Sequence, residues 1–166
     1  MTACGDPAAA SRFLALATAP SRPRIDTPVV VVVAHPDDES LACGALLPRL
    51  GDVAVIHVTD GAPRNGGYAC RHGFADLPAY AAARRREVQA ALAVAGVGPD
   101  RAICLDVPDQ AAAPEIAGIA RQLVPRLPGA GIVLTHALEG GHPDHDAVAV
   151  AVRAACRLAG PNAPTV

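Results

Sequence analysis

Lysine and tryptophan are absent from this chain of 166 residues, and only two Phe and two Tyr contribute aromatic bulk. Apolar residues nevertheless make up 51% of the chain, which at this length is enough to bury the core of one domain. That core must be built from Val, Leu, Ile and Ala. Such a composition suits a buried parallel sheet covered by Ala-rich helices.

The chain also lacks a concentrated positive charge. Its formal net charge is −2, whereas phosphate-dominated binding of nucleic acid needs a concentrated basic face. The densest basic run, three arginines at residues 84–86, is interpreted as a solvated helix face. We therefore expect no nucleic-acid partner.

The sequence contains neither a disulfide framework nor a convincing membrane anchor. The five cysteines form no CxxC pair and leave an odd number, a pattern that describes neither a disulfide scaffold nor a cysteine zinc site. They are Cys4, Cys43, Cys70, Cys104 and Cys156. The apolar run at residues 13–19 is a poor signal peptide and far too short to span a bilayer. The default expectation is a cytoplasmic protein without a membrane span, and a homo-oligomer is left open.

Strand and helix signals alternate along the chain from about residue 28. Residues 29–33 are five consecutive valines, apolar on both faces as in a central strand of a parallel sheet. Further expected strands are residues 53–59, 102–105 and 132–135, and the expected helices are residues 39–47, 79–95, 116–127 and 144–158. This alternation predicts an α/β fold: a single Rossmann-like domain, with a mostly parallel sheet and helices on both faces.

The segment before the first strand has a different composition. Residues 1–27 are rich in Ala, Pro and Arg and predict an N-terminal extension, with a short helix at about residues 8–17 and a proline-broken linker. Residues 28–166 then form the expected domain. Within it, a glycine-rich loop at about residues 61–77 is long for a compact domain, and loops of that length are often functional.

Two polar clusters follow strands of the expected sheet. The sequence HPDDE at residues 35–39 comes directly after the valine strand, and EGGHPDHD at residues 139–146 follows the strand at residues 132–135. In open α/β sheets, ligands bind beyond the carboxyl ends of the strands. Zinc accepts His nitrogen and carboxylate oxygen, and a catalytic zinc site keeps three protein ligands and one open position for water. The two clusters together predict a metal site.

Spacing within the clusters selects candidate ligands. His35 and Asp38 are three residues apart, so a turn leading into a helix can aim both at one point. His145 would complete a set of two imidazoles and one carboxylate from across the sheet. Asp37 would flank the metal without binding it, and a carboxylate beside a metal-activated water is what a general base needs.

Each cluster taken alone also has a simpler interpretation. The acids at residues 37–39 could cap a helix and complement its dipole, and Pro143 with Asp144 could merely start the last helix. Nucleotide binding on the same sheet is disfavoured. The first strand leads into neither GxGxxG nor GxxxxGK[ST], and paired carboxylates would repel phosphate.

The two clusters contain motifs of a known family. AHPDDE at residues 34–39 and GHPDH at residues 141–145 resemble the signature motifs of the LmbE-like, or PIG-L, family of metal-dependent N-deacetylases. The resemblance extends over about residues 29–155. Weaker matches within it are TDG at residues 59–61, RRRE at residues 84–87 and VPD at residues 107–109.

The resemblance implies a reaction and a role for each motif residue. His35, Asp38 and His145 would be the metal ligands, Asp37 the general base, and His142 the residue that stabilises the oxyanion, as an imidazolium. The reaction would be removal of an N-acetyl or other N-acyl group from an amino sugar or glycoconjugate by zinc-activated water. Zinc is the default metal, and the ligand types are also compatible with Fe²⁺ or Co²⁺. The expected partner is a small-molecule N-acyl substrate.

Several other polar residues near the expected strand ends have two interpretations each. Asp60 and Arg64 could contact the substrate, or could be a turn aspartate and a solvated arginine. Asp109 lies in a strand-end loop and could line the pocket. Glu87 with Arg84 or Arg85 could support the site, or could form an ordinary ion pair on a helix face.

The remaining candidates concern the support of the metal turn. Asp144 could orient a histidine ligand, or could only favour the start of its helix. Glu39 is interpreted first as an acid at a helix start and second as a hydrogen-bonding support for the turn. His57 and His136 are interpreted as structural.

Two alternatives to an amino-sugar deacetylase stay open. One is a zinc amidase that acts on a non-sugar N-acyl conjugate, and the other is a non-catalytic metal-binding α/β fragment. Family members generally continue well beyond the second motif, whereas this sequence ends at Val166. We therefore expect a chain that lacks the family's C-terminal part, as a fragment or as a minimal variant.

Overall fold

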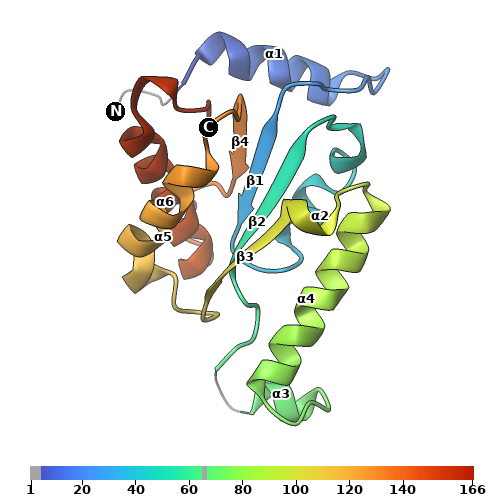
Figure 1. Cartoon of the computed structure of the whole chain (residues 1–166), viewed down its shortest axis with the longest axis vertical. Coiled ribbons are helices and arrows are strands. Elements are labelled where there is room, and N and C mark those ends of the chain that lie inside the picture. Colours follow the sequence, from blue (N-terminus) through green and yellow to red (C-terminus); the bar gives the residue numbers. More distant parts are fainter. Residues whose placement is uncertain (1–4, 65–66) are drawn as a thin grey trace.

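A computed structural model of the protein describes residues 5–64 and 67–166 (Figure 1). Cys4 and two residues of the glycine-rich loop lie outside this described part. The strands are β1 (Val29–Val33), β2 (Val53–Thr59), β3 (Ala102–Val107) and β4 (Ile132–Thr135). They form one sheet in the order β3-β2-β1-β4, with every pair parallel. The predicted α/β fold with a parallel sheet is confirmed.

Helices cover both faces of this sheet, as expected. They are α1 (Pro7–Thr18), α2 (Asp38–Cys43), α3 (Tyr68–Arg71), α4 (Leu77–Val94), α5 (Ile116–Leu123) and α6 (Pro143–Ala159). Figure 1 shows α5 and α6 on one side of the sheet and α4 on the other. Within the described residues, no helix combines the length and the apolar character needed to cross a membrane.

The valine strand β1 supplies both halves of the core. Successive side chains of a strand point to opposite faces of the sheet, so alternate valines join different clusters. Val30 and Val32 pack in the cluster with residues of α5 and α6. Val29 and Val31 pack in the cluster with residues of α1 and α4. All five valines are buried, which is why a run without polar alternation is stable in this place.

Two helices are shorter than the sequence predicts. Helix α2 ends at Cys43, and Pro48 lies in a separate 3₁₀ turn at Leu47–Arg49. Helix α5 ends at Leu123, and a 3₁₀ turn containing Pro125 follows at Val124–Arg126. Proline has no N–H to continue an α-helical ladder, so the apolar periodicity at α5 runs past the end of the helix. The C-cap of α2 is Gly44, ahead of Pro48, and residues 44–46 form a turn. Conversely, β3 extends two residues beyond its predicted end.

The loops that leave β1 and β2 touch at Gly61. This glycine has a φ of +61°, and a Cβ atom on it would lie 2.5 Å from Cδ of Pro36 in the HPDDE turn. Both the left-handed backbone and the close approach require glycine here. The TDG sequence thus brings the β2 loop against the first polar cluster.

The segment before β1 packs onto the sheet. Phe13 of α1 and Ile25 belong to the core cluster on the α4 side of the sheet, with 4% and 0% exposure. Ile25 also forms an isolated parallel bridge with Leu50. The domain boundary predicted at residue 27 stays a prediction. Buried core residues lie on both sides of it, because Phe13 and Ile25 share a core cluster with residues of β1 and α4.

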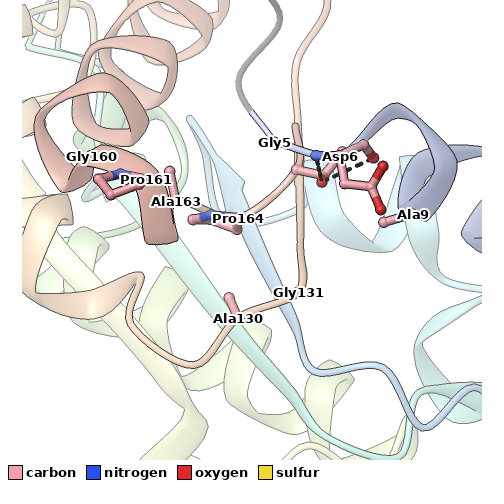
Figure 2. Close-up of a pocket in the computed structure, with 10 residues that line it drawn as sticks. Gly5, Asp6, Ala9, Ala130, Gly131, Gly160, Pro161, Ala163 and Pro164 are labelled. Atoms are coloured by element: carbon pink, nitrogen blue, oxygen red, sulfur yellow. Dashed lines mark hydrogen bonds between the residues drawn. The ribbon is translucent and has the colours of Figure 1, made fainter.

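A cavity of about 530 Å³ lies at the amino-terminal end of β4, bounded by the segments before α1 and after α6 (Figure 2). Its lining is mostly Gly, Ala and Pro. The backbone N–H of Asp6 donates to Oγ1 of Thr165 across it. This end of the sheet lacks the polar clusters, which follow the carboxyl ends of the strands.

We predict that Phe13→Ala lowers the free energy of unfolding by about 3 kcal/mol, because removing a buried aromatic ring loses its transfer energy and leaves a cavity. Urea denaturation followed by circular dichroism measures the change. Leu14→Ala is the matched control, since Leu14 on the same helix is 59% exposed. Equal denaturation midpoints for the two variants would show that α1 is a detachable extension.

Candidate active site

The two polar clusters meet at the point where the order of the strands reverses. The chain runs outward from β1 through β2 to β3 and then returns to β4, which pairs with the other edge of β1. Loops that leave β1 and β4 therefore diverge and open a crevice at their carboxyl ends, where α/β proteins bind ligands. The HPDDE turn follows β1, and GHPDH runs into α6, which follows β4.

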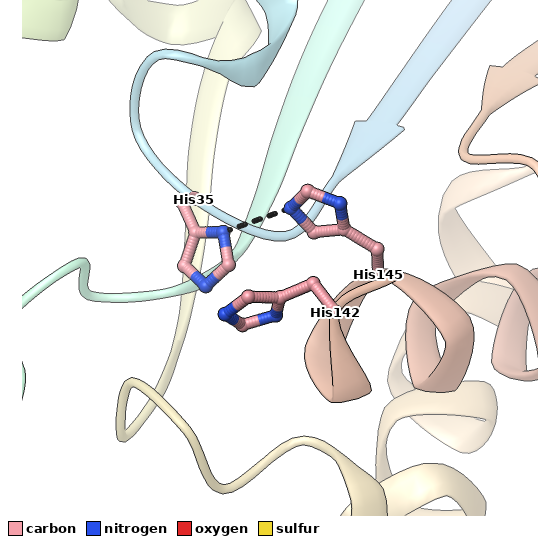
Figure 3. A group of neighbouring side chains, drawn as sticks. All are labelled: His35, His142 and His145. Atoms are coloured by element: carbon pink, nitrogen blue, oxygen red, sulfur yellow. Dashed lines mark hydrogen bonds between the residues drawn. The ribbon is translucent and has the colours of Figure 1, made fainter. Parts of the chain in front are cut away.

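His35, Asp38 and His145 lie together in this crevice. Nδ1 of His35 is 3.4 Å from Oδ2 of Asp38 and 3.3 Å from Nε2 of His145. Nε2 of His145 is 3.5 Å from Oδ1 of Asp38. Figure 3 shows the rings of His35 and His145 facing each other, one from the loop after β1 and the other from α6.

These separations fit a tetrahedral metal ion. Zinc lies about 2.0–2.1 Å from nitrogen and oxygen ligands, so that two tetrahedral ligand atoms are about 3.3 Å apart. The three shortest separations are all within a few tenths of an ångström of that value, with His35 and His145 approaching different oxygens of Asp38. Two imidazoles and one carboxylate are also the donor types that zinc accepts.

Asp144 holds the ring of His35 in this orientation. Its Oδ2 lies 3.3 Å from Nε2 of His35 and accepts the N–H of Gln110 at 2.8 Å, and its Oδ1 accepts the N–H of Ala112 at 3.0 Å. Asp144 is fully buried, and each of its oxygens already accepts a backbone N–H. It is therefore a poor metal ligand, although its distances to His35 and Asp109 would suit one. A proton on Nε2 of His35 leaves the Nδ1 lone pair facing the crevice.

The charges of the three candidate ligands depend on one another. Burial alone would lower the pKa of His35, but the carboxylates of Asp38, Asp109 and Asp144 together outweigh it and raise that pKa. Burial alone would raise the pKa of Asp38, but its contacts with the imidazoles of His136 and His35 lower that pKa far below its usual range. Burial and the nearby imidazoles lower the pKa of His145. Asp38 is therefore ionised and His145 neutral, the forms that bind a metal.

His136, which the sequence led us to interpret as structural, lies inside this cluster. It forms a ligand-like group with Asp38 and His145, and its ring stacks on that of His145 with centroids 4.0 Å apart. However, Nε2 of His136 accepts the N–H of Ala34 at 2.9 Å. The Nε2 lone pair is therefore not available to a metal ion. The hydrogen bond connects the residue after β1 to the residue after β4. The sequence did contain one sign of this location: His136 directly follows the strand at residues 132–135, at the end where α/β sheets bind ligands.

His142 precedes α6 as its N-cap. Nδ1 of His142 accepts the N–H of Asp144 at 3.2 Å. The ring centroid lies 4.8 Å from that of His35 and 4.8 Å from that of His145 (Figure 3). In this arrangement Nδ1 of His142 is an acceptor and Nε2 carries the ring proton; the oxyanion-stabilising role expected for His142 stays a prediction. Nε2 is then a hydrogen-bond donor beside the candidate ligands.

Asp37 is not a helix cap, although it occupies the N-cap position of α2. Its side chain makes no capping hydrogen bond. Instead, Nη2 of Arg84 donates to Oδ2 of Asp37 at 2.8 Å and to the carbonyl oxygen of Pro36 at 2.7 Å. The side chain of Asp37 is 52% exposed.

Arg84 therefore links α4 to the HPDDE turn. Burial acts to lower its pKa, but the Asp37 carboxylate outweighs this and raises it. The helix-face ion pair with Glu87 considered from the sequence is also present, at 3.5 Å. The contact with Asp37 could not be predicted from the spacing of the two residues, because 47 positions separate them.

Glu39 and His57 form a buried pair behind the metal turn. Nε2 of His57 lies 2.8 Å from Oε2 of Glu39, and the exposed fractions of His57 and Glu39 are 2% and 0%. Burial acts to raise the pKa of Glu39, but the hydrogen bond with His57 outweighs it and lowers that pKa. The pair connects α2 to β2, which places Glu39 in the supporting role considered second for it.

Of the three remaining candidates, only Asp109 lies against the candidate ligands. Its Oδ1 is 3.9 Å from Nε2 of His35. Burial raises the pKa of Asp109, and the carboxylates of Asp144 and Asp60 add to this against the opposing effect of His35. Asp60 and Arg64 pair with each other at 2.6 Å, and Oδ1 of Asp60 accepts the N–H of Asp109 at 3.2 Å.

A cavity of about 330 Å³ opens beside the cluster. Among the described residues it is lined by His35, Asp37, Gly61, Pro63, Tyr68, Tyr80, Arg84, Asp109, Gln110 and His142. Asp60 and Arg64 are not among them. Of the three candidate ligands, His35 lines this cavity, together with two acids, one arginine and two tyrosines.

Solved structures of other proteins share this fold. The conserved protein TT1542 from Thermus thermophilus matches with a TM-score of 0.59 and 27% identity, over 83% of this chain and 59% of that one. N,N'-diacetylchitobiose deacetylase from Pyrococcus horikoshii matches with a TM-score of 0.65 and 20% identity, over 93% and 61%. GalB, the 4-carboxy-2-hydroxymuconate hydratase from Pseudomonas putida, matches with a TM-score of 0.54 and 21% identity, over 84% and 62%.

The chain spans about three fifths of the length of these three proteins. The likenesses to the deacetylase and the hydratase show the fold alone. Among curated protein sequences, none matches this chain significantly.

A family-level match covers most of the chain. The sequence model described as PIG-L, GlcNAc-PI de-N-acetylase, matches residues 30–156, a range that contains both the HPDDE and the GHPDH motifs. The fold, the two motifs at its crevice and this match agree: the chain belongs to the PIG-L, or LmbE-like, family.

Proposed function

We propose that the protein is a metal-dependent hydrolase that removes the acyl group from an N-acetylated amino sugar or glycoconjugate. The observation that carries the proposal is the mutual spacing of His35, Asp38 and His145, 3.3–3.5 Å between donor atoms, with Asp37 beside them. The family description, a de-N-acetylase, supports amide hydrolysis over other uses of such a site.

His35, Asp38 and His145 would hold the metal. His136 is the competing imidazole, but its Nε2 lone pair already accepts the N–H of Ala34. His142 is disfavoured as a ligand because Nδ1 caps α6 and Nε2 carries the proton. Zinc suits this donor set, and Fe²⁺ or Co²⁺ would also accept it.

Asp37 would be the general base. When bound, the metal would lower the pKa of water and polarise the acyl carbonyl. Asp37 would accept the proton of the attacking water and then return it to the nitrogen of the leaving amine. Because Arg84 engages Oδ2, Oδ1 is the oxygen available for that proton, and the arginine fixes the direction in which it points.

His142 would stabilise the negative charge that develops on the carbonyl oxygen. Its Nδ1 is fixed by the N–H of Asp144, so Nε2–H is the donor. A donor that is positioned before the reaction stabilises the transition state without having to reorganise. A neutral donor suffices for this role.

The cavity favours a polar, single-ring amine. About 330 Å³ is at the small end of the range for ligand pockets, about 300–1,000 Å³. Arg84, Asp109 and Gln110 offer donors and acceptors for hydroxyl groups. A non-sugar N-acyl conjugate is the alternative in the same chemistry, and comparing amine release from N-acetylglucosaminides and from simple N-acyl amines separates the two.

We predict that Asp37→Asn keeps stoichiometric zinc but lowers the rate of amine release about 10²–10⁴-fold, the usual contribution of a general base. His145→Ala should lose both zinc and activity. Elemental analysis and an amine-release assay on the same samples measure the two quantities.

Asp106→Asn is the matched control for Asp37→Asn. Asp106 is similarly exposed and pairs with Arg85, the neighbour of Arg84 on α4, but does not line the cavity. Near-normal turnover by Asp37→Asn would refute the assignment of the base. Zinc binding without amine release from any N-acyl compound would point to a non-catalytic fragment or to another addition of water, such as hydration of a double bond.

We predict that Asp144→Asn weakens zinc binding about 10–100-fold, the usual effect of removing a carboxylate that orients a ligating histidine. Competition with a chelator measures the affinity. Asp146→Asn is the control, since Asp146 lies in the same turn of α6 but its Oδ1 accepts the N–H groups of Glu139 and Gly140. Equal affinities of the two variants would mean that Asp144 only supports the fold.

A further inference from the structure

Apart from Phe13, the few Phe and Tyr residues of the chain lie outside its core clusters. Three of the four Phe and Tyr residues, Tyr68, Phe74 and Tyr80, lie in one cluster on α3, α4 and the segment between them. Neither core cluster of the described residues contains any of these three. In a protein so poor in aromatic residues, this concentration outside the core calls for another role.

The cluster forms one wall of the cavity beside the candidate ligands. Tyr68 and Tyr80 line the same cavity as Asp37, Arg84 and His142. Their ring centroids are 5.7 Å apart, and the rings are tilted by 50°. The wall stands on α3 and the beginning of α4, whereas the candidate ligands stand on the loop after β1 and on α6.

Two other rings support the wall. Phe74 packs against Tyr80 with centroids 5.0 Å apart, and His72 packs against Tyr68 at 4.5 Å. Tyr68 and Tyr80 are only half-buried. Rings that are supported by neighbours and exposed to a cavity offer a rigid surface for stacking, at a small cost in side-chain entropy.

We propose that Tyr68 and Tyr80 form a stacking subsite that binds the ring of the amine portion of the substrate and thereby sets specificity. The inference rests on the proposed function. An acetyl group must place its carbonyl beside Asp37 and His142, so the amine portion is the part large enough to reach the wall. The apolar face of a six-membered ring would lie on the tyrosines, and its hydroxyl edge would face Arg84.

The sequence provides a direct readout of this subsite. The protein has no tryptophan, and Tyr68 and Tyr80 are its only tyrosines, so intrinsic tyrosine emission reports on the wall alone. We expect zinc-loaded Asp37→Asn protein, in which turnover is slowed about 10²–10⁴-fold, to change its emission saturably on titration with methyl N-acetyl-β-glucosaminide. N-acetylethanolamine, which has the same amide but no ring, should leave the emission unchanged.

Variants of the wall test the same idea by kinetics. In the zinc-loaded protein, Tyr80→Leu and Tyr68→Leu should each lower kcat/KM for the glucosaminide about tenfold, mainly through KM, as expected for loss of an aromatic stacking partner. Tyr80→Phe and Tyr68→Phe keep the ring and should stay within about twofold of the unsubstituted protein. The slow hydrolysis of N-acetylethanolamine should not change in any of the four variants.

The outcomes separate this inference from the proposed function. Amine release that falls equally for both compounds in the Leu variants, or as much in the Phe variants as in the Leu variants, would overturn the stacking subsite and leave the hydrolase standing. If the unsubstituted protein hydrolyses the glucosaminide saturably but the emission of Asp37→Asn does not change on titration, the stacking subsite is likewise overturned and the hydrolase stands. A zinc-loaded protein that hydrolyses neither compound contradicts the proposed function, while the emission titration still decides whether a ring binds at the wall.

Discussion

The pairing of β1 with β4 is the constraint on which the site depends. Hydrogen bonds between these strands set Val29 opposite Ile132 and Val32 opposite Thr135, so the two carboxyl ends lie level. The HPDDE turn and the start of α6 then face each other across the crevice between them. His136 strengthens this junction by accepting the N–H of Ala34. A shift in this register would separate the donor atoms by more than any side-chain rotation could recover.

Around this junction, buried acids hold the parts that carry the candidate ligands. Asp144 is buried against His35, and its oxygens are filled by backbone N–H groups. Glu39 is buried against His57. Burying these acids unpaired would be costly, so their partners are obligatory, and the ligands are oriented before any metal arrives.

The other side of the crevice is built from parts of the chain that carry neither of the two histidine motifs. Arg84 reaches from α4 to Asp37, and Tyr68 and Tyr80 close the cavity from α3 and α4. In the proposed function, the motif residues act on the amide bond, and the residues of α3 and α4 bind the part of the substrate that carries it.

The sequence by itself determined the alternation of strands and helices and the two polar clusters that follow β1 and β4, and it led to the proposal for the chemistry. The five valines could only be a buried strand, and His, Asp and Glu at two strand ends predicted a metal and a base. The end of α5 differs from the prediction because apolar periodicity continues past Pro125, which has no N–H for the hydrogen-bond ladder. Helix α2 is also shorter than predicted, although Pro48 lies beyond both its predicted and its observed end. Only the tertiary structure decided that β4 lies beside β1 and that Arg84 contacts Asp37. It also decided that His136 accepts the N–H of Ala34 and that both tyrosines line the cavity. Those are contacts between residues that are mostly tens of positions apart, and local propensity carries no information about which distant segments pack together.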